Sequence, residues 1–362
     1  MDTFFEPLME DMKILWKTGV QMLDEYRKDL FTLRAIIFVM INDYPSLFIL
    51  SRQFKGKVGC VVCIDGSTYV SLDASKKLVY MRRRRLSKGH RYRLKKMYTY
   101  FDNNEELHST APSRNNKGQG GFQIVGKIKF VFGKKTKDEK PRKEVKPILG
   151  ATFKKNSIFF EYFPYYKELD VRHTIDGMHV QKNVFESLIG TLLDIKGKTK
   201  EGLNSRMDMV QLGIKKELHH VLLENGKYHL LVASYNFNID EKHAMCVWLK
   251  NLKVPFRFCS NLCSILSMKD HTLTNYNSHD CHVMLTTFLP ISIKAINHVF
   301  LKMAVTWLCY FFNKISQKVI ERYELVSLYE FAMETVSQFE MCFPPSLFNI
   351  MVHLVVHLVP QI

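Results

Sequence analysis

Cysteine is sparse in this 362-residue sequence, which contains 8 of them. A small secreted protein held together by disulfides needs a much higher density of cysteine, so that class is excluded. The chain opens without a basic segment followed by an apolar core, and its longest apolar runs, such as 300–312 and 350–359, are shorter than the roughly 18 residues of a membrane span. We therefore expect a soluble protein that is not secreted, in a reducing compartment.

Acidic residues are also scarce relative to basic ones. The sequence has 35 Asp and Glu against 52 Lys and Arg, a formal net charge of +17, and 46% of its residues are hydrophobic. These values exclude an acidic or mainly disordered protein and indicate a folded, basic one of about two to three domains. Such a charge suits nucleic acid or an anionic membrane surface, although basic ribosomal and structural proteins share it.

The first candidate site residue follows an apolar run. Residues 4–26 have helical spacing of apolar side chains, and the run 35–41 predicts a strand buried on both faces that ends at Asn42 and Asp43. Catalytic groups gather at the carboxyl ends of strands in open α/β sheets, which makes Asp43 a candidate catalytic carboxylate. An Asp before a proline turn is also a common turn residue, and the sequence alone leaves both interpretations open.

A basic cluster lies at residues 76–96. It has eleven Lys or Arg in 21 residues and no acid, with Tyr80, His90 and Tyr92 interleaved. It could follow a phosphate backbone while the tyrosines stack on bases, or it could be a solvated loop. The candidate DNA-binding residues are Arg82, Arg83, Arg84, Arg85, Lys88, Arg91, Arg93, Lys95 and Lys96.

The later part of the chain has mostly helical spacing. The aromatic segment 157–166 predicts extended chain, whereas 176–194 and 206–221 predict helices. From residue 265 onward helices are expected almost throughout, including 300–312, 323–341 and 346–359.

Two short motifs contain metal-ligating residues. Cys60-Val-Val-Cys63 provides half of a zinc site, or else two ordinary thiols at the end of a strand. His353-Leu-Val-Val-His357 places two imidazoles on one face of a helix, but Leu354 stands where the HExxH metalloproteases have their glutamate. The apolar surroundings favour a packing role for this histidine pair.

Residues 168–202, which contain Asp176-Gly-Met-His179, closely resemble the signature block of plant CACTA (En/Spm-type) transposases. The resemblance extends over most of the chain. Further matching segments are 6–11, 41–45, 55–57, 60–63, 267–270, 278–283, 289–293 and 343–358.

This resemblance implies a DDE-type transposase, in which acidic residues of an RNase H-like core hold two Mg²⁺ or Mn²⁺ ions. Asp43 then corresponds to the second catalytic carboxylate, and Asp176 and His179 belong to the D/CxxH element of the insertion before the last acid. Cys60 and Cys63 match the family's CxxC, and His179, with His173 as a further candidate, would complete their zinc site. The role of Asp176 itself is left open.

The implied fold is α/β to mainly α, with an incomplete RNase H-like core and a large helical insertion and C-terminal region. We expect a partial core with the CxxC and the basic cluster (1–135), a Lys-rich linker (136–156), a DxxH helical segment (157–225), a connector (226–264) and a truncated helical domain that follows the catalytic region (265–362).

The sequence also departs from the family pattern. The blocks bearing the first catalytic Asp and the last Glu would lie before Met1 and after Ile362, which leaves Asp43 as a remnant. Val79 and Arg83 stand where the family usually has Cys and His. We therefore expect a nuclear, transposon-derived protein truncated at both ends, which binds DNA non-specifically and does not cut it. The alternatives are a repurposed module that binds proteins through its C-terminal helices and a fragment of an active transposase.

Overall fold

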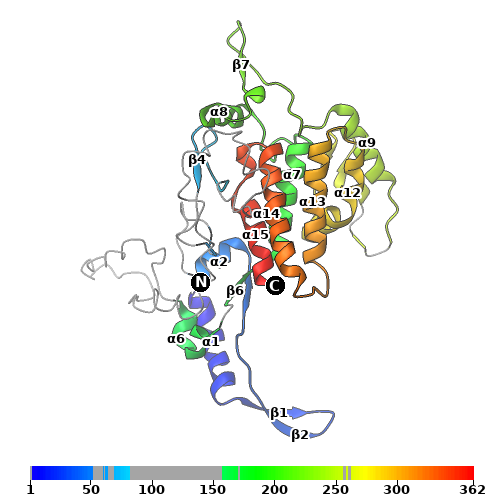
Figure 1. Cartoon of the computed structure of the whole chain (residues 1–362). Helices are drawn as coiled ribbons and strands as arrows, with labels where there is room; N and C mark the ends of the chain where they lie inside the picture. Colours follow the sequence, from blue (N-terminus) through cyan, green and yellow to red (C-terminus); the bar gives the residue numbers. More distant parts are fainter. Residues whose placement is uncertain are drawn as a thin grey trace, which may run out of the picture. The chain divides into compact units, whose positions relative to one another are not determined.

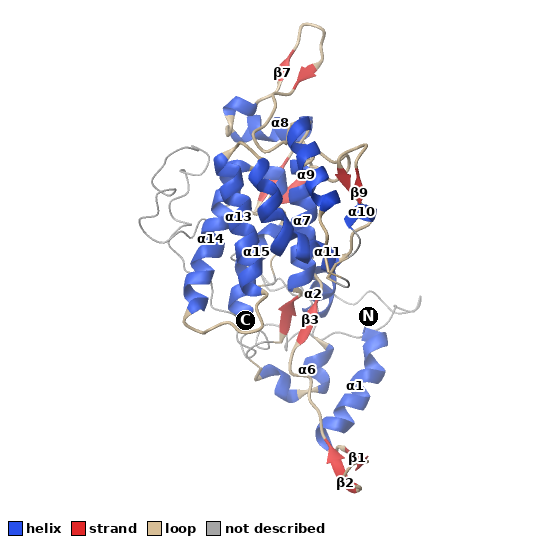
Figure 2. Cartoon of the chain, turned by 90° about the vertical axis from the view of Figure 1, so that its right-hand side faces the viewer, coloured by secondary structure: helices blue, strands red, loops and turns tan. Residues whose placement is uncertain are grey.

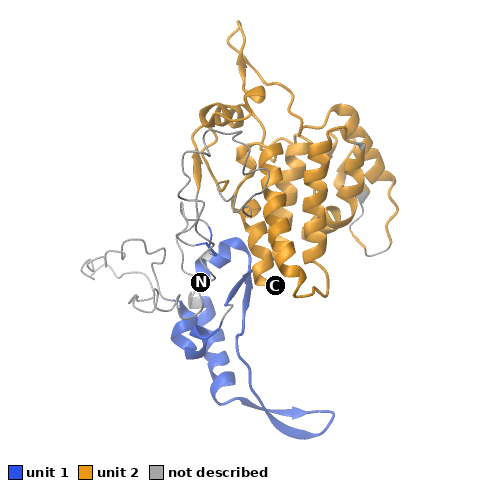
Figure 3. Cartoon of the chain, in the orientation of Figure 1, with its two compact units in different colours: residues 1–67, 112–176 blue, residues 68–111, 177–362 orange. Residues whose placement is uncertain are grey.

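The computed structural model describes residues 2–51, 60, 62–63, 69–81, 157–169, 172–255, 258–259 and 262–362. The chain divides into two compact units (Figure 3). Unit 1 comprises residues 1–67 and 112–176, and unit 2 comprises residues 68–111 and 177–362. The candidate DNA-binding residues from Arg82 to Lys96 and the linker 136–156 lie outside the described residues.

Unit 1 is built on an aromatic core. Its elements are α1 (Asp2–Lys17), β1 (Val20–Asp24), β2 (Asp29–Leu33), β3 (Met40–Asn42), α2 (Tyr44–Ser51), α6 (Ile158–Tyr162), a 3₁₀ turn (Pro164–Lys167) and β6 (His173–Ile175) (Figure 1). Buried Met9 of α1 packs in this core with Phe159 of α6 and with Phe163. Trp16 and Phe5 lie partly buried against it, so one face of the amphipathic helix α1 provides much of the contact.

Three local predictions for unit 1 need correction. The helix predicted over 4–26 ends at Lys17, because Gly19 turns the chain with a φ of +75° into the hairpin of β1 and β2. Segment 157–166 is not extended, since α6 and the 3₁₀ turn let its aromatic rings gather on one core. The strand predicted over 35–41 is limited to β3, and Ile41 on it is 71% exposed.

The short strand β3 has one partner in the described residues. It pairs in parallel with β6, with Met40 opposite His173 and Asn42 opposite Ile175. A single partner leaves much of the strand open to solvent, which explains the exposure of Ile41. Every sheet in the described part of the chain is two-stranded, and the RNase H-like core stays a prediction.

The hairpin of β1 and β2 extends from the end of α1 (Figure 1). Its register places Val20 opposite Leu33 and Met22 opposite Phe31. These apolar side chains share one face, and all are exposed.

Unit 2 is mainly helical (Figure 2). Its longer helices are α7 (Gly177–Leu192), α8 (Leu203–Leu212), α9 (Ile239–Asn251), α13 (Val299–Ile315), α14 (Glu324–Cys342) and α15 (Ile350–Leu358). Shorter elements are β4 (Val70–Leu72), β5 (Lys77–Val79), β7 (Val221–Leu222), β8 (Tyr228–His229), α10 (Leu262–Ile265), β9 (Leu266–Ser267), β10 (Thr272–Leu273), α11 (Ser278–Val283), a π-helix (Met284–Phe288) and α12 (Leu289–Ser292). The helices predicted over 176–194, 300–312 and 323–341 are confirmed.

The helix predicted over 206–221 is shorter than expected. It is α8, which ends because Gly213 adopts a left-handed conformation with a φ of +67°. A 3₁₀ turn at Lys216–Leu218 and the strand β7 follow it.

The helix α15 lies in the core of unit 2. It packs against α7 and α14, and α14 in turn packs against α13 (Figures 1 and 2). Leu354 and Val355 are fully buried, as the apolar composition of this helix predicts. No helix in the described part of the chain combines the length and the apolar character needed to cross a membrane.

Candidate functional site

The two predicted carboxylates lie at one edge of the parallel pair in unit 1. Asp43 follows β3 and Asp176 follows β6, directly after the paired residues Asn42 and Ile175. The backbone N–H of Asp176 donates to the backbone oxygen of Asn42 at 2.9 Å, which continues the pairing to the strand ends. The structure thus places both residues at the carboxyl edge, where the sequence placed Asp43.

Asp43 also has a local structural role. Its Oδ1 accepts a hydrogen bond from the backbone N–H of Ser46 at 2.8 Å, at the start of α2. This contact satisfies one of the N–H groups that the first turn of a helix leaves without a partner. The turn interpretation of Asp43 is therefore supported, and it does not exclude a second role for the other carboxylate oxygen.

His173 sits beside this edge in an aromatic environment. Its ring lies edge-on to Phe159 and Tyr166, with centroids 6.1 and 6.2 Å away. Burial lowers the pKa of this histidine to about 3, with a further contribution from the positive charge of Arg172. The imidazole is therefore neutral at physiological pH and packs as part of the core.

The cysteine pair of the CxxC is linked by a local hydrogen bond. Cys60 and Cys63 are both buried, and the backbone N–H of Cys63 donates to Sγ of Cys60 at 3.4 Å. A hydrogen bond to sulfur stabilises the thiolate, which is the form that binds metal.

The histidine pair lies on α15. His353 and His357 are each 4% exposed, and their Nε2 atoms are 3.1 Å apart. Asn349 caps this helix by accepting from the backbone N–H of Met351 at 3.0 Å, which fixes where the helix starts. Tyr80 lies over the His353 ring at 5.5 Å between centroids. The pair is therefore held in a defined arrangement inside unit 2.

The two pairs belong to different units, since Cys60 and Cys63 lie in unit 1 and His353 and His357 lie in unit 2. Thiolates and imidazoles are donors that zinc prefers. The zinc site that the sequence places at the CxxC stays a prediction.

The other predicted zinc ligands lie on separate elements. His179 lies on α7, where its backbone oxygen accepts a hydrogen bond from Nδ2 of Asn183 at 2.8 Å. His173 lies on β6, with its ring against Phe159 and Tyr166. Their role as zinc ligands stays a prediction.

The hairpin of β4 and β5, which precedes the arginines of the basic cluster, is anchored to the helical part of unit 2. Asp208 of α8 is fully buried and accepts from the backbone N–H groups of Ala74 at 2.8 Å and Ser75 at 3.1 Å. After β5, the N–H of Tyr80 donates to the backbone oxygen of Phe348 at 2.8 Å. The chain is therefore anchored on both sides of β5 just before the arginines begin.

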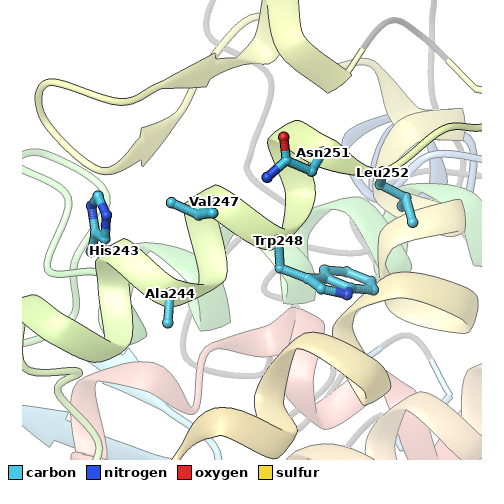
Figure 4. A pocket seen from close by; sticks show the side chains of 6 residues that line it. All are labelled: His243, Ala244, Val247, Trp248, Asn251 and Leu252. Atoms are coloured by element: carbon cyan, nitrogen blue, oxygen red, sulfur yellow. The ribbon is translucent and has the colours of Figure 1, made fainter.

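A hollow of about 540 Å³ lies on the surface along α9 (Figure 4). It is lined by His243, Ala244, Val247, Trp248, Asn251 and Leu252. Nδ1 of His243 is 3.2 Å from Nε2 of His271, and both histidines are accessible to solvent. The lining has no carboxylate or thiol, so the hollow lacks the groups of a metal-dependent or nucleophilic active site.

Comparison with known families gives two matches. Residues 1–119 match the model described as transposase family tnp2, and residues 315–362 match a domain of unknown function, DUF4218. Residues 1–119 are therefore transposase-like. Asp43, Cys60 and Cys63 fall in the first matched segment, and His353 and His357 fall in the second. No curated protein and no solved structure matches the chain.

Proposed function

We propose that this chain is derived from a CACTA-type transposase, acts in the nucleus, binds DNA through phosphate contacts and does not cut it. The observation that carries the proposal is the match of residues 1–119 to a transposase family, because this segment contains the acid-free basic cluster. The net charge of +17 supports a polyanionic partner.

The binding is dominated by the DNA backbone. Lys and Arg side chains that neutralise phosphates release counterions, which gives affinity without reading the sequence. The anchored hairpin of β4 and β5 would hold the start of the basic cluster against the helices of unit 2. This would reduce the conformational entropy that is lost when the arginines bind DNA.

The absence of cutting follows from the carboxylates. When bound in the intact family, two divalent ions supply the Lewis acid and the activated water. Asp43 and Asp176 could bind and orient one such ion at the carboxyl edge, but they belong to no group of three or more ligands among the described residues. Two side chains cannot hold two ions in a fixed geometry.

A zinc ion would be bound by Cys60 and Cys63 in this proposal, in a structural rather than a catalytic role. The ion would compensate the two buried thiolates and stabilise the fold.

The experiment is a fluorescence anisotropy titration of the full chain on two unrelated DNA duplexes over a salt series. Substitution of Arg82, Arg83, Arg84 and Arg85 by Ala should weaken binding equally on both duplexes. It should also reduce the slope of log K against log salt by up to about four phosphate equivalents. The matched control replaces Lys250, Lys294, Lys318 and Arg322, which are exposed and carry the same total charge, by Ala. Equal effects of both quadruple variants, or none, would contradict a role for the arginine cluster.

A second candidate function is a protein-interaction module. Val319 and Tyr323, just before α14, and Val326 in its first turn are exposed, inside the segment that matches DUF4218. This exposed apolar group would become the leading candidate for function if the arginine variants bound DNA like the wild type.

A further inference from the structure

We propose that His243 and His271 bind one exchangeable transition-metal ion on the surface of unit 2, through Nδ1 of the first and Nε2 of the second. Water molecules complete the coordination of the ion. Both histidines belong to unit 2. The site is separate from the zinc ion proposed for Cys60 and Cys63, and it does not depend on DNA binding.

The two ligand atoms have the separation that one ion requires. Nδ1 of His243 lies 3.2 Å from Nε2 of His271. For this separation, bonds of about 2.0–2.1 Å from each nitrogen to one ion give an angle of about 100° at the metal, between the square-planar and tetrahedral values. The ring planes are 80° apart and the ring centroids are 5.4 Å apart, so the rings are not stacked. A small rotation of the two rings therefore directs both lone pairs at the same ion.

The backbone of His243 is fixed by helix α9. Oδ1 of Asn238 accepts from the backbone N–H of Glu241 at 2.8 Å, and the Glu241 side chain accepts in return from the backbone N–H of Asn238 at 3.0 Å. This capping box sets where the helix begins, and Met245 and Cys246, which follow His243, are buried. His243 itself is exposed, so an ion can reach its ring from solvent.

The backbone of His271 is fixed by the turn between β9 and β10. The next two residues, Thr272 and Leu273, pair with Ser267 and Leu266, and Leu273 is buried. His271 adopts a left-handed conformation with a φ of +49°. This conformation is uncommon for residues other than glycine, and residues held in it are frequent at ligand-binding sites. The turn therefore presents the His271 ring to His243 from a defined position.

The donor atoms decide which ions fit. Imidazole nitrogen suits Zn²⁺, Ni²⁺ and Cu²⁺, whereas Mg²⁺ and Ca²⁺ require oxygen ligands. The histidine pair belongs to no group of three or more metal-ligating side chains among the described residues. Two protein ligands leave at least two positions of the ion to water. The ion therefore exchanges with solvent, and it is not held rigidly enough to form a catalytic centre.

The test is a calorimetric titration of the full chain, without a histidine tag, with Ni²⁺. The variants His243→Gln and His271→Asn should each lower the Ni²⁺ affinity at least about tenfold, because each removes one of two ligands. Asparagine is chosen at the second position because it tolerates the left-handed backbone. The matched control is His229→Gln, which changes an exposed histidine of unit 2 and should keep the wild-type affinity. Comparison with the wild type separates this pair from other groups that bind Ni²⁺.

Two isosteric variants separate the loss of a ligand from a change in folding. His243→Glu and His243→Gln introduce side chains of the same shape, but the first carries a carboxylate that can bind Ni²⁺. His243→Glu should therefore bind Ni²⁺ more tightly than His243→Gln, whereas His229→Glu and His229→Gln should not differ. Wild-type Ni²⁺ affinity in both His243→Gln and His271→Asn would overturn the proposal. So would an equal loss of affinity in His229→Gln, or equal affinities of His243→Glu and His243→Gln.

Discussion

Whether a side chain of this protein is available to a ligand depends more on its immediate surroundings than on the sequence motif to which it belongs. Asp43 illustrates this, because the carboxylate that the family resemblance assigns to metal chemistry accepts a hydrogen bond at Oδ1 from the backbone N–H of Ser46. His173 lies in the signature block, yet its ring packs against Phe159 and Tyr166. A motif therefore indicates which residue types are present, and the packing decides which of them remain available to a ligand.

His173 makes the stability of the folded chain sensitive to acid. Its folded-state pKa is lowered to about 3 from a usual value of 6.5, so between these values the unfolded chain binds a proton that the folded chain does not. The free energy of unfolding should consequently fall as pH decreases below about 6.5, by up to about 1.4 kcal/mol per pH unit from this group. Replacing His173 by Gln should reduce that fall in urea unfolding measured between pH 7 and pH 4.5.

The control for this pH effect is His229→Gln, which changes an exposed histidine. Both variants are measured in the presence of a chelator so that metal release does not contribute. If His173→Gln and His229→Gln showed the same pH dependence as the wild type, His173 would not be buried in neutral form.

Elements are held in place here by a few buried polar contacts. The hairpin of β4 and β5 is only three residues long on each side, which is too short for independent stability. Its turn is attached to α8 through Asp208 and its end to Phe348 through Tyr80. The position of this hairpin therefore depends on the helices of unit 2 rather than on its own strand pairing.

Asp208→Ala should release the hairpin. The substitution removes a buried carboxylate that accepts two backbone hydrogen bonds, and hydrogen bonds to a charged group contribute about 1.5–3 kcal/mol each. We expect a loss of about 2–4 kcal/mol in unfolding free energy and faster hydrogen exchange across residues 70–79. Gln211→Ala, which removes an exposed hydrogen bond to Asp73, should change stability by less than about 0.5 kcal/mol. Equal effects of both variants would contradict the anchoring role of Asp208.

The sequence predicted some of the helices and strands correctly and others not. Helices α7, α13 and α14 were predictable because their apolar spacing is a local property of the chain. The run 35–41 was misleading, since its apolar character indicates burial but not the number of partner strands.

At the scale of the whole molecule, the chain combines a transposase-like segment with a strand edge at which two carboxylates lie. Asp43 and Asp176 lie at the ends of neighbouring strands, in a sheet of two strands. A phosphoryl-transfer site with two metal ions needs several oxygen ligands held rigidly. Among the described residues this edge presents two carboxylates, and we therefore expect it not to support the two-metal chemistry of a DDE transposase.

Purified protein should not nick or join DNA in Mg²⁺ or Mn²⁺. The measurement is conversion of supercoiled plasmid to nicked or linear forms, with Asp43→Ala as the control for a contaminating nuclease. Cleavage that is present in the wild type and lost in Asp43→Ala would contradict this expectation. Cleavage of equal rate in both preparations would come from a contaminant.

The hairpin of β1 and β2 has a further consequence for how the protein behaves at high concentration. Each of its strands has one partner in the described structure, and its apolar face carries Val20, Met22, Phe31 and Leu33 in exposed positions. Backbone groups along an open strand edge can pair with a strand of another polypeptide, and an apolar face strengthens such pairing. Two hairpins could thus join into a four-stranded ribbon, and we expect reversible self-association through β-strand addition at this segment.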